Sequence, residues 1–218
     1  MRYFLKYLPR RLAYSIWNKE YHIKRGYVHR VSVPHYDDTD NKDEWQDGVY
    51  AFAKEVFTKN FFTSVLDIGC GSAYKLFKYF DEVEFTGVEV EPTLSFLRNK
   101  YSDQEWLYLE QIRRERLFDL VILSDVIEHI ERPDEFLRLI KKRIKFKYLI
   151  ISTPERDLIK GKYNYGPPTN KHHYREWNKV EFNKFISDYF IINKHFYIHN
   201  EGIQVIKCSP IENDGNNS

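Results

Sequence analysis

The chain has little cysteine and no long hydrophobic run, and both absences narrow the classes of protein it can belong to. Its two cysteines, Cys70 and Cys208, lie far apart and form no CxxC or Cys/His ligand spacing. This argues against a disulfide framework and against a structural zinc site. No apolar run approaches the roughly 20 residues that span a bilayer, and the start does not resemble a secretory signal. We therefore expect a cytoplasmic protein without a transmembrane segment.

An excess of charge of one sign is also missing. The 34 Lys and Arg residues nearly balance the 32 Asp and Glu residues, which leaves a net charge of +2. No chain-wide field therefore marks the protein as a nucleic-acid binder. A chain of 218 residues that is 42% hydrophobic can bury one good core, so we expect one domain and one site.

The first thirty residues carry eight Lys or Arg, interleaved with aromatic residues, and a single acid, Glu20. This composition fits an amphipathic arm packed on the domain, a membrane-surface helix, or a contact to an anionic substrate. Pro9 and Gly26 interrupt any long helix, which favours the first interpretation. We expect residues 1–44 to form an arm and connector packed on the domain, 45–209 the main domain, and 210–218 a disordered tail.

From residue 45 onward, helical and strand patterns alternate. Helical spacing follows "DEWQDG", and further helices are expected at about 73–80, 92–100, 133–144 and 179–188. Strand patterns lie at 64–68, 84–89, 106–110, 118–124, 147–153, 189–198 and 202–208. The alternation predicts a parallel sheet covered on both faces. After "STPE" we expect a long irregular loop, and "HNEG" between the last two strands predicts a hairpin turn.

The stretch "VLDIGCGSAYKL" places an acid and two glycines at the end of a buried strand. A parallel sheet binds its ligand at that end. Gly69 and Gly71 allow a sharp turn and close approach to a ligand, and Asp67 can accept a bond from a ligand cation or order the loop. Glu89 ends the next strand, where a ribose would present two hydroxyls. Without a third glycine or a Lys-Ser pair, an uncharged ribose with an amino-acid end fits better than a pyrophosphate.

Four motifs, "VLDIGCGSAYKL", "GVEVEP", "FDLVILSDVIEHIERPDEFL" and "LIISTPERD", resemble successive motifs of class I S-adenosylmethionine-dependent methyltransferases over residues 45–208. The resemblance implies an α/β, Rossmann-like, doubly wound and mostly parallel seven-stranded sheet with a C-terminal antiparallel hairpin. It implies S-adenosylmethionine as cofactor and S-adenosylhomocysteine as product. The adenine contact matches poorly, with Glu110 or Gln111 as candidates. The cofactor-binding residues that it implies are Asp67, Gly69, Cys70, Gly71, Glu89, Val90, Glu110, Asp125 and Val126.

The candidate catalytic residues are Glu128 and His129 in "DVIEH". Imidazole has an unperturbed pKa suited to a general base near neutral pH. Alternatively, both residues brace the start of the following helix. A third interpretation is a divalent cation held by Asp125, Glu128, His129 and His172 or His173. This resembles the E-x-x-E-H magnesium motif of quinone-precursor and small-RNA methyltransferases, with Asp in the first place, and we favour it less than hydrogen bonding alone.

The loop "GPPTNKHHYREW" concentrates polar and aromatic groups after the fifth strand. Together with the segment before the first motif it predicts an acceptor site and lid. The expected residues are Tyr36, Gln46, Tyr50, His172, His173, Tyr174 and Arg175.

The pattern "STPERD…GPP.N..H.REW" is similar to one in methyltransferases of surface polysaccharide and capsule clusters. It implies O-methylation of a polar small molecule, such as a sugar or a phosphorylated or nucleotide-linked precursor. The alternatives are an RNA methyltransferase that uses the basic arm and a cofactor-binding module without catalysis.

Overall fold

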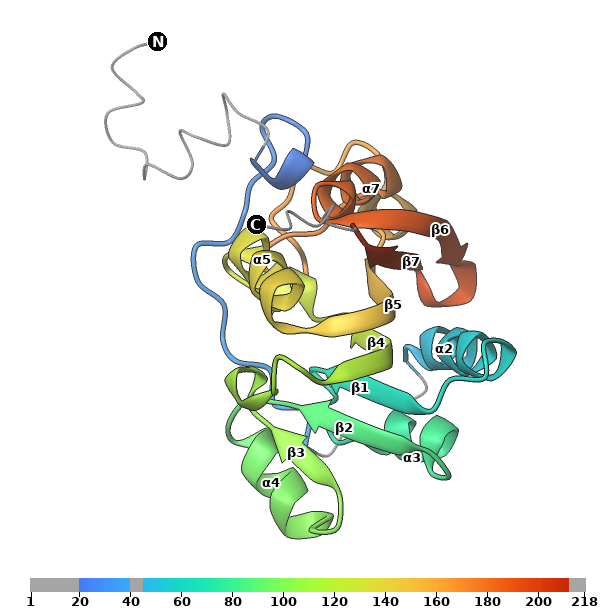
Figure 1. The fold of residues 1–218 in the computed structure, drawn as a ribbon. Coiled ribbons are helices and arrows are strands. Elements are labelled where there is room, and N and C mark those ends of the chain that lie inside the picture. The colour runs from blue at the N-terminus through green and yellow to red at the C-terminus, as the bar shows by residue number, and fades with distance from the viewer. Residues whose placement is uncertain (1–19, 40–44, 212–218) are drawn as a thin grey trace, which may run out of the picture.

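The computed structural model describes residues 20–39 and 45–211, and within them seven strands form one sheet. The spatial order is β3-β2-β1-β4-β5-β7-β6 (Figure 1). Strands β1 to β5 are parallel, whereas β7 is antiparallel to both β5 and β6. The strands are β1 (Ser64–Ile68), β2 (Glu84–Val88), β3 (Glu105–Leu107), β4 (Leu117–Ser124), β5 (Lys145–Pro154), β6 (Phe190–Ile198) and β7 (Ile203–Pro210). The expected Rossmann-like sheet with a C-terminal antiparallel hairpin is confirmed.

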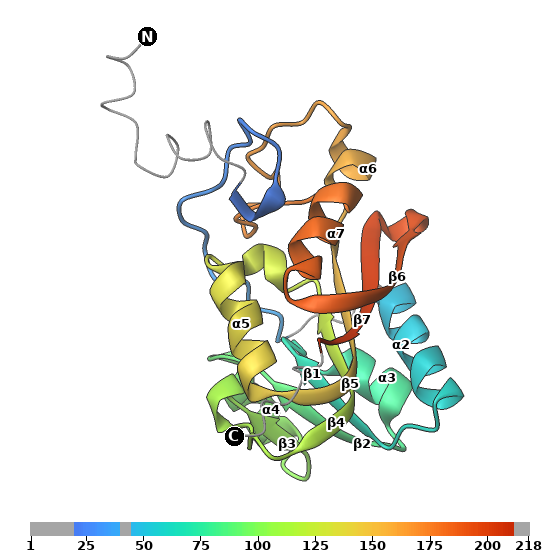
Figure 2. The same ribbon diagram turned by 45° about the horizontal axis from the view of Figure 1, so that its top comes forward.

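Helices cover both faces of the sheet, with α5 and α7 on one side and α2 and α3 on the other (Figure 2). Neighbouring residues of one strand point to opposite faces. Leu66 therefore packs in the cluster with α5 and α7, while Val65 packs in the cluster with α2 and α3. Burial on both faces explains the uniformly apolar strands. The helices are α2 (Asp47–Lys59), α3 (Tyr74–Phe80), α4 (Thr93–Lys100), α5 (Pro133–Arg143), α6 (Arg156–Lys160) and α7 (Lys179–Ser187).

Two elements differ from the sequence expectation. The strand expected at 106–110 ends at Leu107, and a 3-10 turn, η3 (Leu109–Gln111), follows it. The side chain of Gln111 accepts a hydrogen bond from the backbone N–H of Tyr108 at 2.8 Å, which turns the chain out of the sheet. The loop expected after "STPE" begins with α6, because the Glu155 carboxylate accepts the backbone N–H of Leu158 at the start of the helix.

Residues 20–30 pack on the domain. The side chains of Ile23 and Tyr27 are buried in the same cluster as α5 and α7. The backbone N–H of Lys24 donates to the Glu181 carboxylate at 3.0 Å, and that of Val28 donates to a carbonyl of the 160–177 loop at 2.8 Å. Of the arm and connector expected at 1–44, residues 1–19 and 40–44 lie outside the described residues, as do residues 212–218 of the expected tail. Strand β7 ends at Pro210, one residue beyond the expected domain boundary at 209.

None of the helices in the described ranges is both long and apolar enough to cross a membrane.

Candidate active site

A cavity of about 760 Å³ opens at the carboxyl ends of the parallel strands. Ile68, Val88, Ser124 and Pro154 are the last residues of β1, β2, β4 and β5, and all four line it. The strand order reverses between β1 and β4, which is the point where open α/β sheets bind their ligands. The site therefore lies where the sequence pattern predicts it.

The loop after β1 requires its two glycines. Gly69 and Gly71 have φ angles of +76° and +54°, in the left-handed region. A Cβ atom would lie 2.4 Å from the Val126 side chain at Gly69 and 2.0 Å from an Asp38 oxygen at Gly71. Between them Cys70 lines the cavity, and burial raises the pKa of its thiol well above the ordinary value, which favours the protonated thiol. The loop thus offers the backbone of Gly69 to a ligand, whereas Gly71 lies under the Asp38 side chain and does not line the cavity.

Glu89 is held in place by two backbone groups. Its Oε1 accepts the N–H of Gly71 at 2.9 Å, and its Oε2 accepts the N–H of Val90 at 2.9 Å. Burial raises the pKa of the carboxyl group, while these two hydrogen bonds favour the carboxylate. Each carboxylate oxygen keeps a further lone pair. Glu89 can therefore accept from two neighbouring hydroxyls, as a ribose presents them.

Asp67 lies behind the glycine loop and does not line the cavity itself. Its Oδ2 accepts the phenol of Tyr50 at 2.8 Å, and its Oδ1 is buried without a hydrogen-bond partner among the described residues. Burial raises the pKa of Asp67 to about 7. A buried carboxylate oxygen without a donor is costly unless a cation compensates it. Asp67 therefore does not contact a ligand directly, but its charge can favour an ammonium group on the cavity side of the glycine loop.

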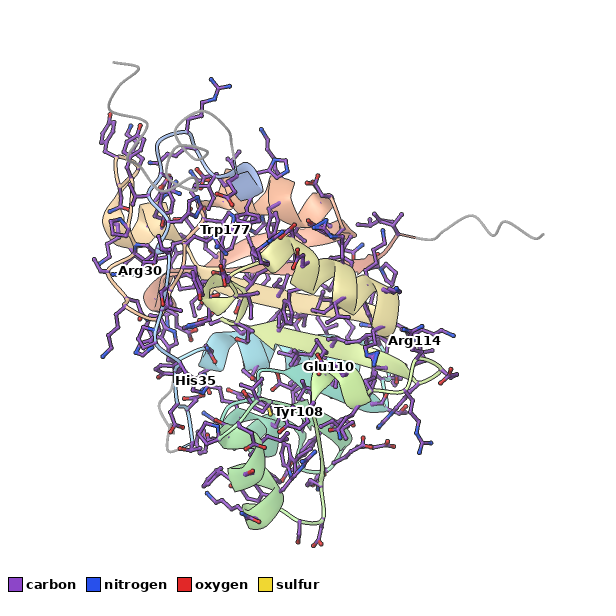
Figure 3. All side chains as sticks on the ribbon, turned by 90° about the vertical axis from the view of Figure 1, so that its left-hand side faces the viewer. Arg30, His35, Tyr108, Glu110, Arg114 and Trp177 are labelled. Atoms are coloured by element: carbon purple, nitrogen blue, oxygen red, sulfur yellow. The ribbon has the colours of Figure 1, made fainter. Side chains whose placement is uncertain are left out.

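The part of the cavity beside Glu89 is formed by the segments that follow β2 and β3. Val90, Tyr108 and Glu110 line it, and Tyr108 and Glu110 lie on the same side of the molecule as His35 (Figure 3). Of the two candidates for an adenine contact, only Glu110 reaches the cavity. Gln111 does not line it, because its side chain binds the Tyr108 backbone and the Arg98 guanidinium.

His129 lines the cavity from the 3-10 turn η4 (Ile127–His129) that follows β4. Its Nδ1 lies 2.9 Å from the carbonyl oxygen of His172. A carbonyl can only accept, so Nδ1 carries the hydrogen and Nε2 keeps its lone pair. Burial and the nearby His173 lower the pKa of His129 to about 3. The ring is therefore neutral near pH 7, and the ordinary pKa expected for a general base does not hold here.

Three side chains beside His172 could hold a divalent cation, but only if His173 gave up one of its ring hydrogen bonds, to Asn170 at 3.0 Å or to Glu176 at 2.8 Å. The ligand atoms of Glu128, His129 and His173 all lie within 4.8 Å of one another. Glu128 is fully buried: its Oε2 accepts the hydroxyl of Thr153 at 3.0 Å, and its Oε1 has no partner among the described residues. Burial and the charge of Asp125 raise the pKa of Glu128 well above its ordinary value. Neutral imidazoles and a carboxylate are suitable ligands for magnesium, manganese or zinc.

Asp125 belongs to a different hydrogen-bond network. Its Oδ1 accepts the hydroxyl of Ser152 at 2.6 Å, and its Oδ2 accepts the indole N–H of Trp45 at 3.2 Å. Its backbone is left-handed, with a φ of 51°. The cluster of cation ligands does not include Asp125, contrary to the expected set of four. Asp125 and Val126 line the middle of the cavity, between the glycine loop and His129.

Most of the expected acceptor-site residues line the cavity, and one does not. Tyr36, Gln46, Tyr50, His172, His173 and Tyr174 all border it. Arg175 does not, and its placement in the acceptor site is wrong. Its guanidinium donates to the backbone oxygens of Ile130 and Glu131 at 2.6 and 2.9 Å, because the chain folds back over the segment that follows η4. Arg175 therefore holds the loop to the domain.

The segment 33–38 also borders the cavity, and its contribution beyond Tyr36 was not predicted. It crosses to the cavity because Arg30 donates its backbone N–H to Tyr174 at 2.9 Å, and the carbonyl of Pro34 lies 3.0 Å from Nδ1 of His172. His35 and Asp38 thereby enter the lining. Their only sequence signal is a histidine and acids in a turn-rich connector, which is typical of many surface segments.

The family of the chain is shown by a sequence match that covers most of the sheet and most of the residues that border the cavity. A sequence model described as "Methyltransferase domain" matches residues 34–197. The chain belongs to this family. The match includes the segment 33–38 almost completely and every strand that ends at the cavity. The expected methyltransferase family, with S-adenosylmethionine as its cofactor, is confirmed at this level. No curated protein matches this methyltransferase in sequence.

Solved structures share the fold with this methyltransferase at low sequence identity. The PH0226 protein from Pyrococcus horikoshii OT3 is 19% identical, with a TM-score of 0.59 over 80% of this chain and 95% of that chain. The 16S rRNA methylase ArmA is 19% identical, with a TM-score of 0.54 over 77% and 85%. Magnesium protoporphyrin IX methyltransferase (ChlM) from Synechocystis PCC 6803, solved with bound SAH, is 15% identical, with a TM-score of 0.56 over 79% and 90%. ArmA and ChlM are named for different acceptors, 16S rRNA and magnesium protoporphyrin IX, so the shared fold does not identify an acceptor for this chain.

Proposed function

We propose that this methyltransferase transfers a methyl group from S-adenosylmethionine to a hydroxyl oxygen of a polar small molecule. The observation that carries the proposal is the cluster of Glu128, His129 and His173 in the same cavity as Glu89 and the glycine loop. One end of the cavity fits the cofactor, and the other end offers groups that can orient and deprotonate an acceptor.

The residues divide the work of an in-line displacement. Glu89 and the loop around Gly69 hold the cofactor, and the charge of Asp67 behind the loop favours the cofactor's ammonium group, so that the methyl group has a fixed direction. The Nε2 lone pair of His129 accepts the hydrogen of the acceptor hydroxyl. An imidazole with a pKa of about 3 is a weak base. If that lone pair instead joined Glu128 and His173 in holding a divalent cation, the cation would supply Lewis acidity, make the hydroxyl more acidic and let its proton pass to solvent.

The lining favours an acceptor with hydroxyl groups. Among the described residues that border the cavity, Lys75 is the single Lys or Arg. Phosphate groups are usually bound by Arg, Lys or helix N-termini, so a phosphorylated acceptor would place its phosphates outside the cavity. The imidazoles of His35, His129, His172 and His173 and the ring of Tyr36 suit a sugar. A sugar or nucleotide-linked sugar precursor of a surface glycan or capsule therefore remains our proposed acceptor.

The first test is calorimetric titration of the full chain with S-adenosylhomocysteine, with magnesium and after chelation. Binding in the micromolar range would support the cofactor assignment, and no binding under any condition would overturn it. Nucleotide-linked and free sugars are then screened with radiolabelled S-adenosylmethionine. Label that enters a base-stable, ether-linked product supports O-methylation.

Two other outcomes would point to the alternative functions. Transfer of label to RNA, with binding that weakens steeply as salt rises, would indicate an RNA methyltransferase. Tight cofactor binding without turnover on any acceptor would indicate a cofactor-binding module. We favour the small-molecule acceptor because the cavity of the described residues offers a single basic side chain for a phosphate backbone.

A further inference from the structure

A cluster of apolar side chains lies exposed at the end of α6 and in the loop that follows. Leu158 and Ile159 are 46% and 39% exposed, and Tyr163 and Tyr165 are 80% and 49% exposed. We call these four residues, with Lys160 and Lys162 between them, the 158–165 surface. Several large apolar side chains exposed within eight residues are typical of a binding surface.

The surface is built from two parts of the chain. Lys24 places its Nζ 4.1 Å from the ring centre of Tyr165 and donates to the carbonyl oxygen of Lys162 at 2.7 Å. The Nζ of Lys162 lies 5.2 Å from the ring centre of Tyr163. In Figure 2 the loop after α6 lies at the top of the molecule, beside the segment that begins at residue 20. Lysines and apolar groups therefore alternate over one surface.

The charge of this surface has one sign. Residues 158–171 contain three lysines and no acid, and the neighbouring Arg25 is exposed. The preceding acid, Asp157, is engaged: its carboxylate accepts from the Arg156 guanidinium at 3.1 Å and from the Asn178 amide at 2.9 Å. The surface is therefore apolar and cationic, without a neutralising carboxylate in the loop.

We propose that the 158–165 surface binds the interface of a membrane that contains anionic lipid. Exposed Leu, Ile and Tyr side chains can enter the boundary between headgroups and acyl chains, while lysines pair with anionic headgroups. Protein–protein interfaces are depleted of lysine, so this composition fits a lipid surface better than a protein partner. The same loop continues to Asn170 and His172 at the cavity, so binding brings the acceptor end near the headgroups. This inference stands independently of the proposed reaction.

The test is co-sedimentation of the full chain with vesicles of phosphatidylcholine, with and without phosphatidylglycerol. We expect binding to the anionic vesicles that weakens as salt rises. Neutralising two lysines in Lys160→Gln/Lys162→Gln should weaken binding roughly thirtyfold, because each lysine near an anionic surface contributes about 1 kcal/mol to the binding free energy. Leu158→Ser/Tyr163→Ser should weaken it at every salt concentration, because it removes apolar contacts rather than charge.

Matched controls come from residues outside the 158–165 surface, at the end of α5, the start of β5 and the segment before β1. Lys142→Gln/Lys145→Gln removes the same charge, and Phe61→Ser removes an aromatic side chain that is 90% exposed. Both should bind vesicles as the unchanged protein does, and circular dichroism checks the folding of each variant. Residues 1–19 are the same in all of them, so a difference belongs to the 158–165 surface. Equal binding by all variants, or no binding of the unchanged protein to anionic vesicles, would overturn the proposal.

Discussion

The ring of Tyr36 stacks on the ring of His129, with centroids 5.9 Å apart and an interplanar angle of 25°. Tyr36 comes from the segment before the first helix of the domain, and His129 from the turn after β4. The same tyrosine meets His172 edge-on at 5.1 Å. One aromatic ring therefore joins the N-terminal segment to both sides of the acceptor end.

Replacing Tyr36 by Ala should disturb acceptor binding more than cofactor binding. The Tyr36 ring borders the cavity and holds the His129 ring in place, and one stacked aromatic ring contributes about 1 kcal/mol. If this free energy is lost from acceptor binding, the acceptor KM should rise roughly fivefold. The affinity for S-adenosylhomocysteine, measured by calorimetry, should stay unchanged. Tyr36→Phe keeps the ring and should behave as the unchanged protein. An equal loss of cofactor affinity in Tyr36→Ala would assign the ring to the cofactor end instead.

The variant Glu89→Ala should weaken S-adenosylhomocysteine binding by about a hundredfold. It removes the acceptor for two ribose hydroxyls and also the bond that orders Gly71, and hydrogen bonds to a charged group contribute about 1.5–3 kcal/mol each. Calorimetric titration measures the loss. Glu84→Ala is the matched control, because this carboxylate lies at the other end of β2 and is 71% exposed. Unchanged affinity in Glu89→Ala would remove the residue from the site.

The affinity for the cofactor product should depend on pH through Asp67. Its pKa is about 7 in the free protein, and an ammonium ligand favours the ionised form. Binding below pH 7 must therefore release a proton, so affinity rises with pH, by up to about tenfold per unit, and levels off above the pKa. Calorimetry at several pH values measures this slope.

Two variants assign that slope to its source. Asp67→Asn should bind more weakly and show a shallower dependence on pH. Tyr50→Phe removes a donor that favours the carboxylate, so the rise in affinity should move to higher pH. If Asp67→Asn keeps the full slope, another group is responsible, with Glu89 as the first candidate because burial also raises its pKa.

His129→Ala should lower turnover by about a hundredfold to ten-thousandfold, the range for loss of a positioned proton acceptor. Cofactor affinity should change little, since His129 lies at the other end of the cavity. His195→Ala is a matched control: that histidine is also held with a lowered pKa, of about 4, but it bonds Gln204 in the C-terminal hairpin. Equal activity of both variants would leave His129 a structural role.

Glu128→Gln should abolish binding of a divalent cation, measured with Mn²⁺ by electron paramagnetic resonance. The substitution keeps the shape of the side chain and removes the charge that a cation needs. Glu110→Gln is the control, because Glu110 also borders the cavity but lies outside the cluster. Failure of the unchanged protein to bind Mn²⁺, or equal binding by Glu128→Gln, would contradict the cation site.

The strand and loop positions of the cofactor end could be predicted because their signals are local. The stretch from Val65 to Leu76 carries its own strand, its left-handed glycines and its helix start, and Glu89 follows the next strand directly. Parallel strands bring such ends together by topology alone. The strand expected at 106–110 ends early because the Gln111 side chain accepts the backbone N–H of Tyr108 and begins a turn. Strand propensity does not predict a hydrogen bond of this kind.

The sequence alone determined the fold, the place of the cavity and most of the residues that border it, since strand order and alternation fix these with little help from distant contacts. Only the tertiary structure decided the chemistry of the acceptor end. Burial beside His173 keeps the ring of His129 neutral. Asp125 bonds Ser152 and Trp45 and lies outside the cluster of candidate cation ligands. The Arg175 side chain bonds backbone oxygens and does not border the cavity. Desolvation and competition for hydrogen bonds depend on neighbours that are distant in sequence, so no local pattern records them.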